Sequence, residues 1–217
     1  MQHDPPDPND PYHHSLERLT ILTDGVFAIA MTLLAIELAL PESAQHLSRY
    51  DLLRALLATW PHVFAYVQSF SILALFWLVN HRLHRVLWRV DQPYLLLHLL
   101  FLLFIAFQPY PTSVLGAHLF DPVAFLFYTS VLMLTGGIRW AMWWYATQHA
   151  LLNPELSAEQ IGYFHRLLAV SPIMFLLLSV VNLWDLVFGA GRGPVIVATG
   201  LGYLFAALYL IKNVRES

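Results

Sequence analysis

The chain has 217 residues, of which 58% are hydrophobic and only 12% charged, and its formal net charge is −3. Soluble globular domains carry about 25% charged residues, so this composition excludes an ordinary soluble domain and predicts a polytopic membrane protein. The small negative charge argues against a nucleic-acid partner, which requires a basic surface. The lack of cysteine excludes disulfides, thiolate metal sites and a cysteine nucleophile.

The N-terminal residues, MQHDPPDPNDPYHHS, are rich in proline and aspartate. They contain neither the basic region nor the apolar region of a signal peptide. We therefore expect a disordered cytoplasmic tail over residues 1–15, followed by one transmembrane domain over residues 16–217.

Six apolar segments follow, each near the roughly 20 residues that a helix needs to cross a bilayer. The third is expected to break at Gln108-Pro109-Tyr110-Pro111, and Asp121-Pro122 has the pattern of a helix start. The sequence thus predicts an all-α protein with six transmembrane helices. The predicted segments are residues 18–40, 51–80 with a possible kink at Trp60-Pro61, 93–107, 122–148, 166–188 and 194–211.

The basic residues near the segment ends predict the orientation in the membrane, because loops on the cytoplasmic side are enriched in lysine and arginine. With the N-terminus inside, seven basic residues fall on the inner side and three on the outer side, so we expect both termini in the cytoplasm. The inner set is Arg18, Arg82, Arg85, Arg89, Arg166, Lys212 and Arg215, and the outer set is Arg49, Arg54 and Arg192.

The first segment has an uneven distribution of side chains around its helix. At about 100° per residue, one narrow stripe contains six residues, and the carboxylate of Asp24 lies about 140° away from Ile29. A stripe that faces a symmetry axis would direct Asp24 back into its own subunit, which predicts a pore-lining helix. The stripe consists of Arg18, Leu22, Gly25, Ile29, Leu33 and Ile36.

Polar residues at the start of the first segment and at the end of the second fall at the same depth in the membrane. Pairing of Asp24 with Arg18 or His81 would avoid the cost of a lone intramembrane charge. The cluster is expected either to hold two helices together or, beyond that, to orient the pore helix. No nucleophile or third group joins the Asp/His pair, so an enzyme is not expected. The cluster comprises Arg18, Thr23, Asp24, Trp77, Asn80 and His81.

Two of these stretches carry a family resemblance. Arg18-x-x-x-Leu22-Thr23-Asp24, followed by GVFAIAMTLLAIEL, resembles the first-helix signature Arg-x-x-x-Phe-Ser-Asp of the TMEM175 potassium channels, prokaryotic branch. Leu22 and Thr23 replace the family's Phe and Ser. The stretch FWLVNHRLHR resembles the family's tryptophan-histidine stretch, with Asn80 where a histidine is common. The hydrophobic layout of the whole chain is similar as well.

The resemblance implies a homotetrameric, potassium-permeable channel in a cell membrane, such as a bacterial inner membrane, with no cofactor or resident metal. It also implies that Ile29, Leu33 and Ile36 line the ion path and form a hydrophobic gate. Thr32 lies about 60° from Ile29 on the helix and is a further candidate for contact with monovalent cations. Because the chain has no TVGYG loop, selectivity for potassium is expected to be modest.

Two other functions stay open at this point. A secondary transporter would use Asp24 as its coupling acid, although the second half of the chain has no polar signature matching the first, as an internal repeat would require. A non-conducting membrane scaffold or sensor, surrounded by membrane lipids, is the second alternative. His81 and His84 lie one turn apart, but no further ligands that would complete a metal site can be placed.

Overall fold

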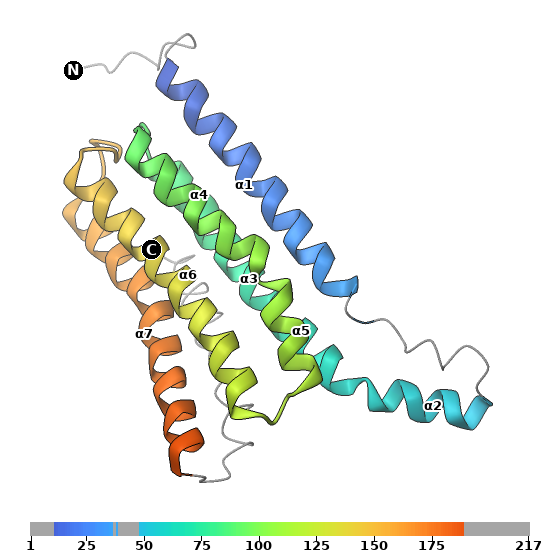
Figure 1. Cartoon of the computed structure of the whole chain (residues 1–217). Coiled ribbons are helices and arrows are strands. Elements are labelled where there is room, and N and C mark those ends of the chain that lie inside the picture. Colours follow the sequence, from blue (N-terminus) through green and yellow to red (C-terminus); the bar gives the residue numbers. More distant parts are fainter. Residues whose placement is uncertain (1–10, 37, 39–47, 189–217) are drawn as a thin grey trace.

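The computed structural model describes residues 11–36, 38 and 48–188, and the regular elements in these ranges are all helices. This confirms the predicted all-α fold class. The long helices run up and down beside one another, and the short α2 points away from the others (Figure 1). The helices are α1 (Pro11–Ile36), α2 (Arg49–Ala58), α3 (Trp60–Val86), α4 (Gln92–Phe107), α5 (Pro109–Ala117), α6 (Pro122–Gln148) and α7 (Ala158–Phe188).

Within the described residues, five helical stretches are long and apolar enough to cross a membrane. The predicted sixth segment, residues 194–211, lies outside them. α1 begins at Pro11, so the last residues of the predicted N-terminal tail are helical. The stretches are Ser15–Ile36, Trp60–Val86, Gln92–Ala117, Pro122–Gln148 and Ala158–Phe188.

The predicted second segment, residues 51–80, is two helices instead of one kinked helix. α2 ends before Thr59, whose dihedral angles are φ −80° and ψ 0°, and α3 starts at Trp60 with Pro61 in its first turn. Pro61 lacks the N–H that a helix continuing from α2 would use. The chain therefore begins a new helix here, and α3 continues to Val86, beyond the predicted end.

The predicted break lies where it is expected, since α4 ends at Phe107 and α5 begins at Pro109, but the membrane span does not end there. Gln108 keeps helical dihedral angles, φ −56° and ψ −32°, and α5 continues the direction of α4, so that both form one span. Pro109 occupies the first turn of α5, where the missing N–H is tolerated. The two prolines therefore mark a junction within the membrane and not the end of the segment.

Helix ends on opposite sides of the bundle are fixed by short polar contacts. Asp121 caps α6 by accepting a hydrogen bond from the Val123 N–H at 2.7 Å, which confirms the predicted helix start. Asp91 caps α4 and also accepts from the Tyr145 hydroxyl of α6 at 2.8 Å. α7 begins at Ala158, eight residues before the predicted start at 166.

The α6–α7 pair forms the tightest helix contact. A Cβ atom added at Gly136 would lie 2.8 Å from the Ser171 hydroxyl and 3.2 Å from the Pro172 ring. Only glycine allows this approach, because any side chain would overlap with α7. The two helices therefore form a closely packed pair, which contacts α4 and α5 through α6.

Candidate functional site

α1 has one buried and one exposed face. The buried face packs against α3, α4 and α5. Its residues recur every three or four positions, as expected for a helix that packs between neighbouring helices. Its Phe27 ring lies 6.1 Å from the Phe101 ring of α4. The buried face consists of Leu19, Thr23, Phe27, Ala30 and Leu34.

All six residues of the predicted pore-lining stripe are exposed in the single chain. Ile29, Leu33 and Ile36 have 60%, 40% and 66% of their surface accessible, although each is strongly apolar. Thr32 is exposed too, but its hydroxyl donates to the Ile29 carbonyl at 2.8 Å, which satisfies it on its own helix. The stripe is thus available to a second copy of the chain or to lipid, and it contributes nothing to the core of its own subunit.

The lower end of the stripe borders an apolar groove of about 310 Å³ between α1 and the α4–α5 junction. Leu33 and Ile36 form one wall, and Phe107 and Tyr110 form the other. The two aromatic rings are in contact, with centroids 5.5 Å apart. The junction prolines therefore place aromatic side chains beside the stripe.

Thr23, the hydroxyl residue of the first-helix motif, binds a histidine that sequence reasoning missed. Its Oγ1 lies 2.7 Å from the Nε2 of His98 in α4, and both side chains are buried. The Thr23 hydroxyl also donates to the Leu19 carbonyl at 2.7 Å. Since a hydroxyl has one proton, the ring N–H of His98 must be the donor in the contact with Thr23. Leu22, by contrast, is exposed, so the missing aromatic ring of the family motif concerns the surface of α1.

A parallel contact joins α1 to α3 one turn earlier. Thr20 Oγ1 lies 3.0 Å from His84 Nδ1 and donates to the Leu16 carbonyl at 3.0 Å, so His84 donates to Thr20. The other ring nitrogen of His84 then accepts from the Asn80 amide at 3.2 Å. The His84 and His98 rings are 5.3 Å apart, so the two contacts form one polar layer across three helices.

Asp24 is exposed and accepts a hydrogen bond from the Trp77 indole N–H at 2.8 Å. The indole ring stacks on His81, with centroids 5.7 Å apart, and His81 lies 3.1 Å from an Arg85 nitrogen. The expected pairing of Asp24 with Arg18 or His81 is therefore wrong: within the described residues Trp77 is the partner of the carboxylate. Arg18 is exposed and takes no part in these contacts.

Of the predicted motif residues, Asp24, Trp77 and His81 contact one another across α1 and α3. Thr23 instead contacts α4, Asn80 contacts His84, and Arg18 joins none of these contacts. The sequence signal for the missed residues was present. His98 is a lone histidine within the apolar run LLLHLLFLL, where an imidazole must find a partner on another helix. Among the described residues, no group of three or more histidine, aspartate and glutamate side chains is arranged to hold a metal ion.

Known proteins resemble this chain over the region that contains α1 and the polar layer. The model of the family described as endosomal/lysosomal potassium channel TMEM175 matches residues 18–109. A potassium channel of Streptomyces collinus is 34% identical over 146 residues, which are 65% of this chain and 69% of the relative. A potassium channel of Chamaesiphon minutus is 28% identical over 174 residues, 77% of this chain and 85% of the relative.

A solved structure supports the same fold. The crystal structure of a lysosomal potassium-selective channel TMEM175 homolog from Chamaesiphon minutus superposes with a TM-score of 0.75 at 22% identity. The match covers 92% of this chain and 98% of that chain.

Proposed function

The chain belongs to the TMEM175 family and is a multi-pass membrane protein, and on this premise we propose that it is a potassium-permeable cation channel. The relatives named potassium channel support this function. The observation that carries it in the structure is the exposed apolar stripe on α1, opposite a face that three other helices and a polar layer hold in place.

In this proposal, four copies of α1 surround a central axis, and their Ile29, Leu33 and Ile36 side chains narrow the path. One helix per subunit cannot enclose a pore, so the assembly is a homo-oligomer. Rings of branched aliphatic side chains exclude water when they are close together, and such a constriction closes by dewetting. The polar layer on the opposite face fixes the rotation of α1, so that these three residues turn toward the axis.

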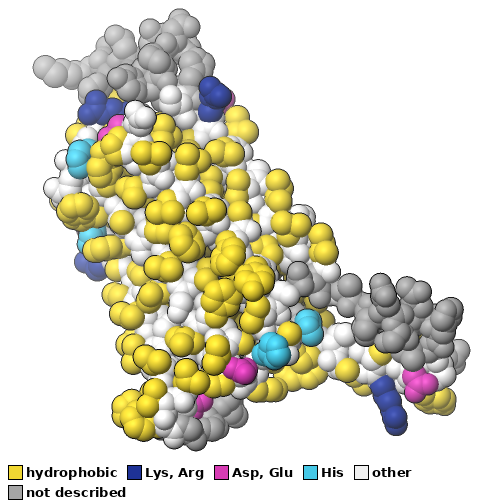
Figure 2. Space-filling model, viewed as in Figure 1, with side chains coloured by type: hydrophobic (Ala, Val, Ile, Leu, Met, Phe, Trp, Pro, Cys, Tyr) yellow, Lys and Arg dark blue, Asp and Glu magenta, His cyan; other side chains and the backbone are white. Residues whose placement is uncertain are grey.

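The proposed orientation has both termini in the cytoplasm, with the upper end of the bundle in Figure 1 inside. Arg18, Arg82, Arg85, Arg89 and Arg166 belong to this end by sequence position, whereas Arg54 is on α2 at the other end. In Figure 2 hydrophobic side chains cover most of the middle of the molecule, and most basic side chains lie near its ends. The excess of arginines at the proposed inner end supports this orientation, because positive residues are enriched on the cytoplasmic side.

The direct test is ion flux through the purified full-length protein in liposomes. A potassium gradient should produce a flux that a sodium gradient produces more weakly, and planar bilayers should show unitary currents. Transport at the slow turnover of a carrier, with no unitary currents, would favour a transporter in which Asp24 couples the ions. Absence of any flux of monovalent cations from liposomes that contain the folded protein would contradict the channel proposal.

A further inference from the structure

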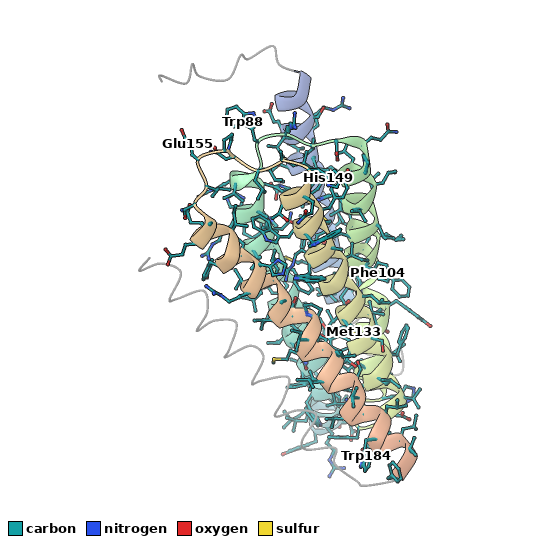
Figure 3. The ribbon with its side chains drawn as sticks, turned by 90° about the vertical axis from the view of Figure 1, so that its left-hand side faces the viewer. Trp88, Phe104, Met133, His149, Glu155 and Trp184 are labelled. Atoms are coloured by element: carbon teal, nitrogen blue, oxygen red, sulfur yellow. The ribbon has the colours of Figure 1, made fainter. Side chains whose placement is uncertain are left out.

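A second groove lies on the far side of the molecule from the α1 stripe, between α6 and α7. It has a volume of about 600 Å³, and every residue that lines it is apolar. Known small-molecule sites have volumes of about 300–1,000 Å³ and are mostly apolar with a few polar groups at one end. Met133, one of the lining residues, lies about midway along the helices in Figure 3, and Pro172 lines the facing wall on α7.

Two adjacent glycines of α6 have different surroundings here. Gly136 lets α6 approach Ser171 and Pro172 of α7 so closely that no side chain would fit. Gly137 lines the groove, and a Cβ atom added there would have no atom within 4 Å. The open space at Gly137 therefore faces out of the helix pair, at a depth where a membrane-spanning protein is surrounded by acyl chains.

One end of the groove carries a positive charge. Arg166 is exposed and precedes the lining residues Ala169 and Ile173 by three and seven positions, so all three lie on one face of α7. Trp140 lines the groove at the same level, because its ring lies 5.4 Å from that of His165. The nearest acidic residue on this face, Glu159, is about 10 Å away by helical rise, too far for an ion pair.

We propose that this groove binds one membrane lipid with an anionic headgroup. The acyl chain fills the apolar groove beside Gly137, and the phosphate lies against the guanidinium of Arg166. Arginine suits this role because its planar group donates two parallel hydrogen bonds to phosphate oxygens. A basic side chain at the cytoplasmic end of a crevice between membrane helices is the arrangement that recognises lipid headgroups. The site does not depend on the channel proposal, since it uses neither α1 nor the polar layer.

The test is native mass spectrometry of the delipidated full-length protein, titrated with phosphatidylglycerol and, separately, with phosphatidylcholine. Gly137→Trp should lower the affinity of both lipids about tenfold or more, because the Cβ atom meets no other atom within 4 Å and the indole then occupies the space of the acyl chain. Arg166→Gln should abolish the preference for phosphatidylglycerol and leave phosphatidylcholine binding unchanged. In the unchanged protein this preference should be about tenfold in affinity, as one charge-assisted contact provides.

Two matched variants separate these effects from general ones. Leu177→Trp places the same indole side chain at an exposed position of α7 outside the groove, and Arg89→Gln removes an exposed arginine from the same end of the bundle. Both should bind lipid as the unchanged protein does. Wild-type binding by Gly137→Trp, or an unchanged lipid preference in Arg166→Gln, would overturn the proposal.

Other occupants of the groove are distinguished by cross-linking, which is clean because the chain has no cysteine. Gly137→Cys should form no disulfide with itself in a second copy, and none with Gly202→Cys in the predicted sixth segment. A high yield of the first disulfide would mean that a second copy fills the groove. A high yield of the second would mean that the chain covers it. Either result would also overturn the lipid site.

Discussion

Replacing Thr23 by valine tests the polar layer most cleanly. Valine keeps the shape of threonine but removes the hydroxyl, which leaves the ring N–H of His98 without its acceptor at 2.7 Å. Because His98 is completely buried, water cannot replace the lost partner. An orphaned buried donor costs about 1–3 kcal/mol. This exceeds the roughly 0.6 kcal/mol that hydrogen bonds between membrane helices contribute on average.

The assay is thermal unfolding of the purified protein in detergent. A change of 1 kcal/mol shifts the midpoint by about 2–4 °C in a chain of 150–250 residues, so Thr23→Val should unfold roughly 2–12 °C earlier. Thr23→Ser retains the hydroxyl and should restore most of the loss. The matched control is Thr32→Val, since Thr32 is exposed and its hydroxyl binds only its own helix.

The double change Thr23→Val with His98→Phe sharpens the test. Replacing both partners by apolar groups removes the orphaned donor, so the double variant should be more stable than Thr23→Val alone. Equal unfolding temperatures for Thr23→Val and Thr32→Val would refute the argument that Thr23 satisfies a buried imidazole.

The remaining predictions concern the pore face, the motif and the helix pair. Leu33→Ala should raise potassium flux by widening the constriction, whereas Leu34→Ala, at a fully buried position, should lower stability by about 2–5 kcal/mol; equal flux in both variants would contradict the proposed pore face. Asp24→Ala should reduce the yield of assembled oligomer in size-exclusion chromatography, and Asp24→Asn, which still accepts from Trp77, should not. Gly136→Leu should lower the free energy of unfolding by about 1–3 kcal/mol, because the leucine side chain would overlap with α7. An unfolding temperature equal to that of the unchanged protein would show that the helices are not in contact there.

The sequence predicts the helices well where their ends carry a polar cap, and poorly where proline acts inside the membrane. Asp121-Pro122 starts α6 as expected, because the carboxylate and the fixed proline angle act locally. Trp60-Pro61 and Gln108-Pro109 both mark a boundary between two helices, but the first starts a membrane span and the second lies inside one. The direction in which the next helix continues depends on its packing against other helices, which the local sequence does not give.

The candidate site shows the same contrast between what the local sequence predicts and what only packing decides. Helical periodicity places Ile29, Leu33 and Ile36 on one face of α1, and all three are exposed in the structure. The family resemblance, and not the spacing alone, distinguishes this face from the equally apolar face that is buried. The hydrogen-bond partners of the motif residues cannot be predicted from helical periodicity. Thr23 binds His98, 75 residues away, and only the packing of α1 against α4 decides that contact. A carboxylate near an arginine in sequence suggested an ion pair, but Trp77 of α3 is the nearer donor.

In the proposed channel, α1 faces the ion path through the side chains of Leu33 and its neighbours. The most direct measurement is the potassium current of Leu33→Cys and Leu34→Cys channels in planar bilayers before and after a cationic thiol reagent, with mass spectrometry to verify modification. Modification of Leu33→Cys should strongly reduce the current, and the current of Leu34→Cys, whose position is buried against the other helices, should be unaffected. A fully modified Leu33→Cys channel that conducts as before would contradict the proposed pore face.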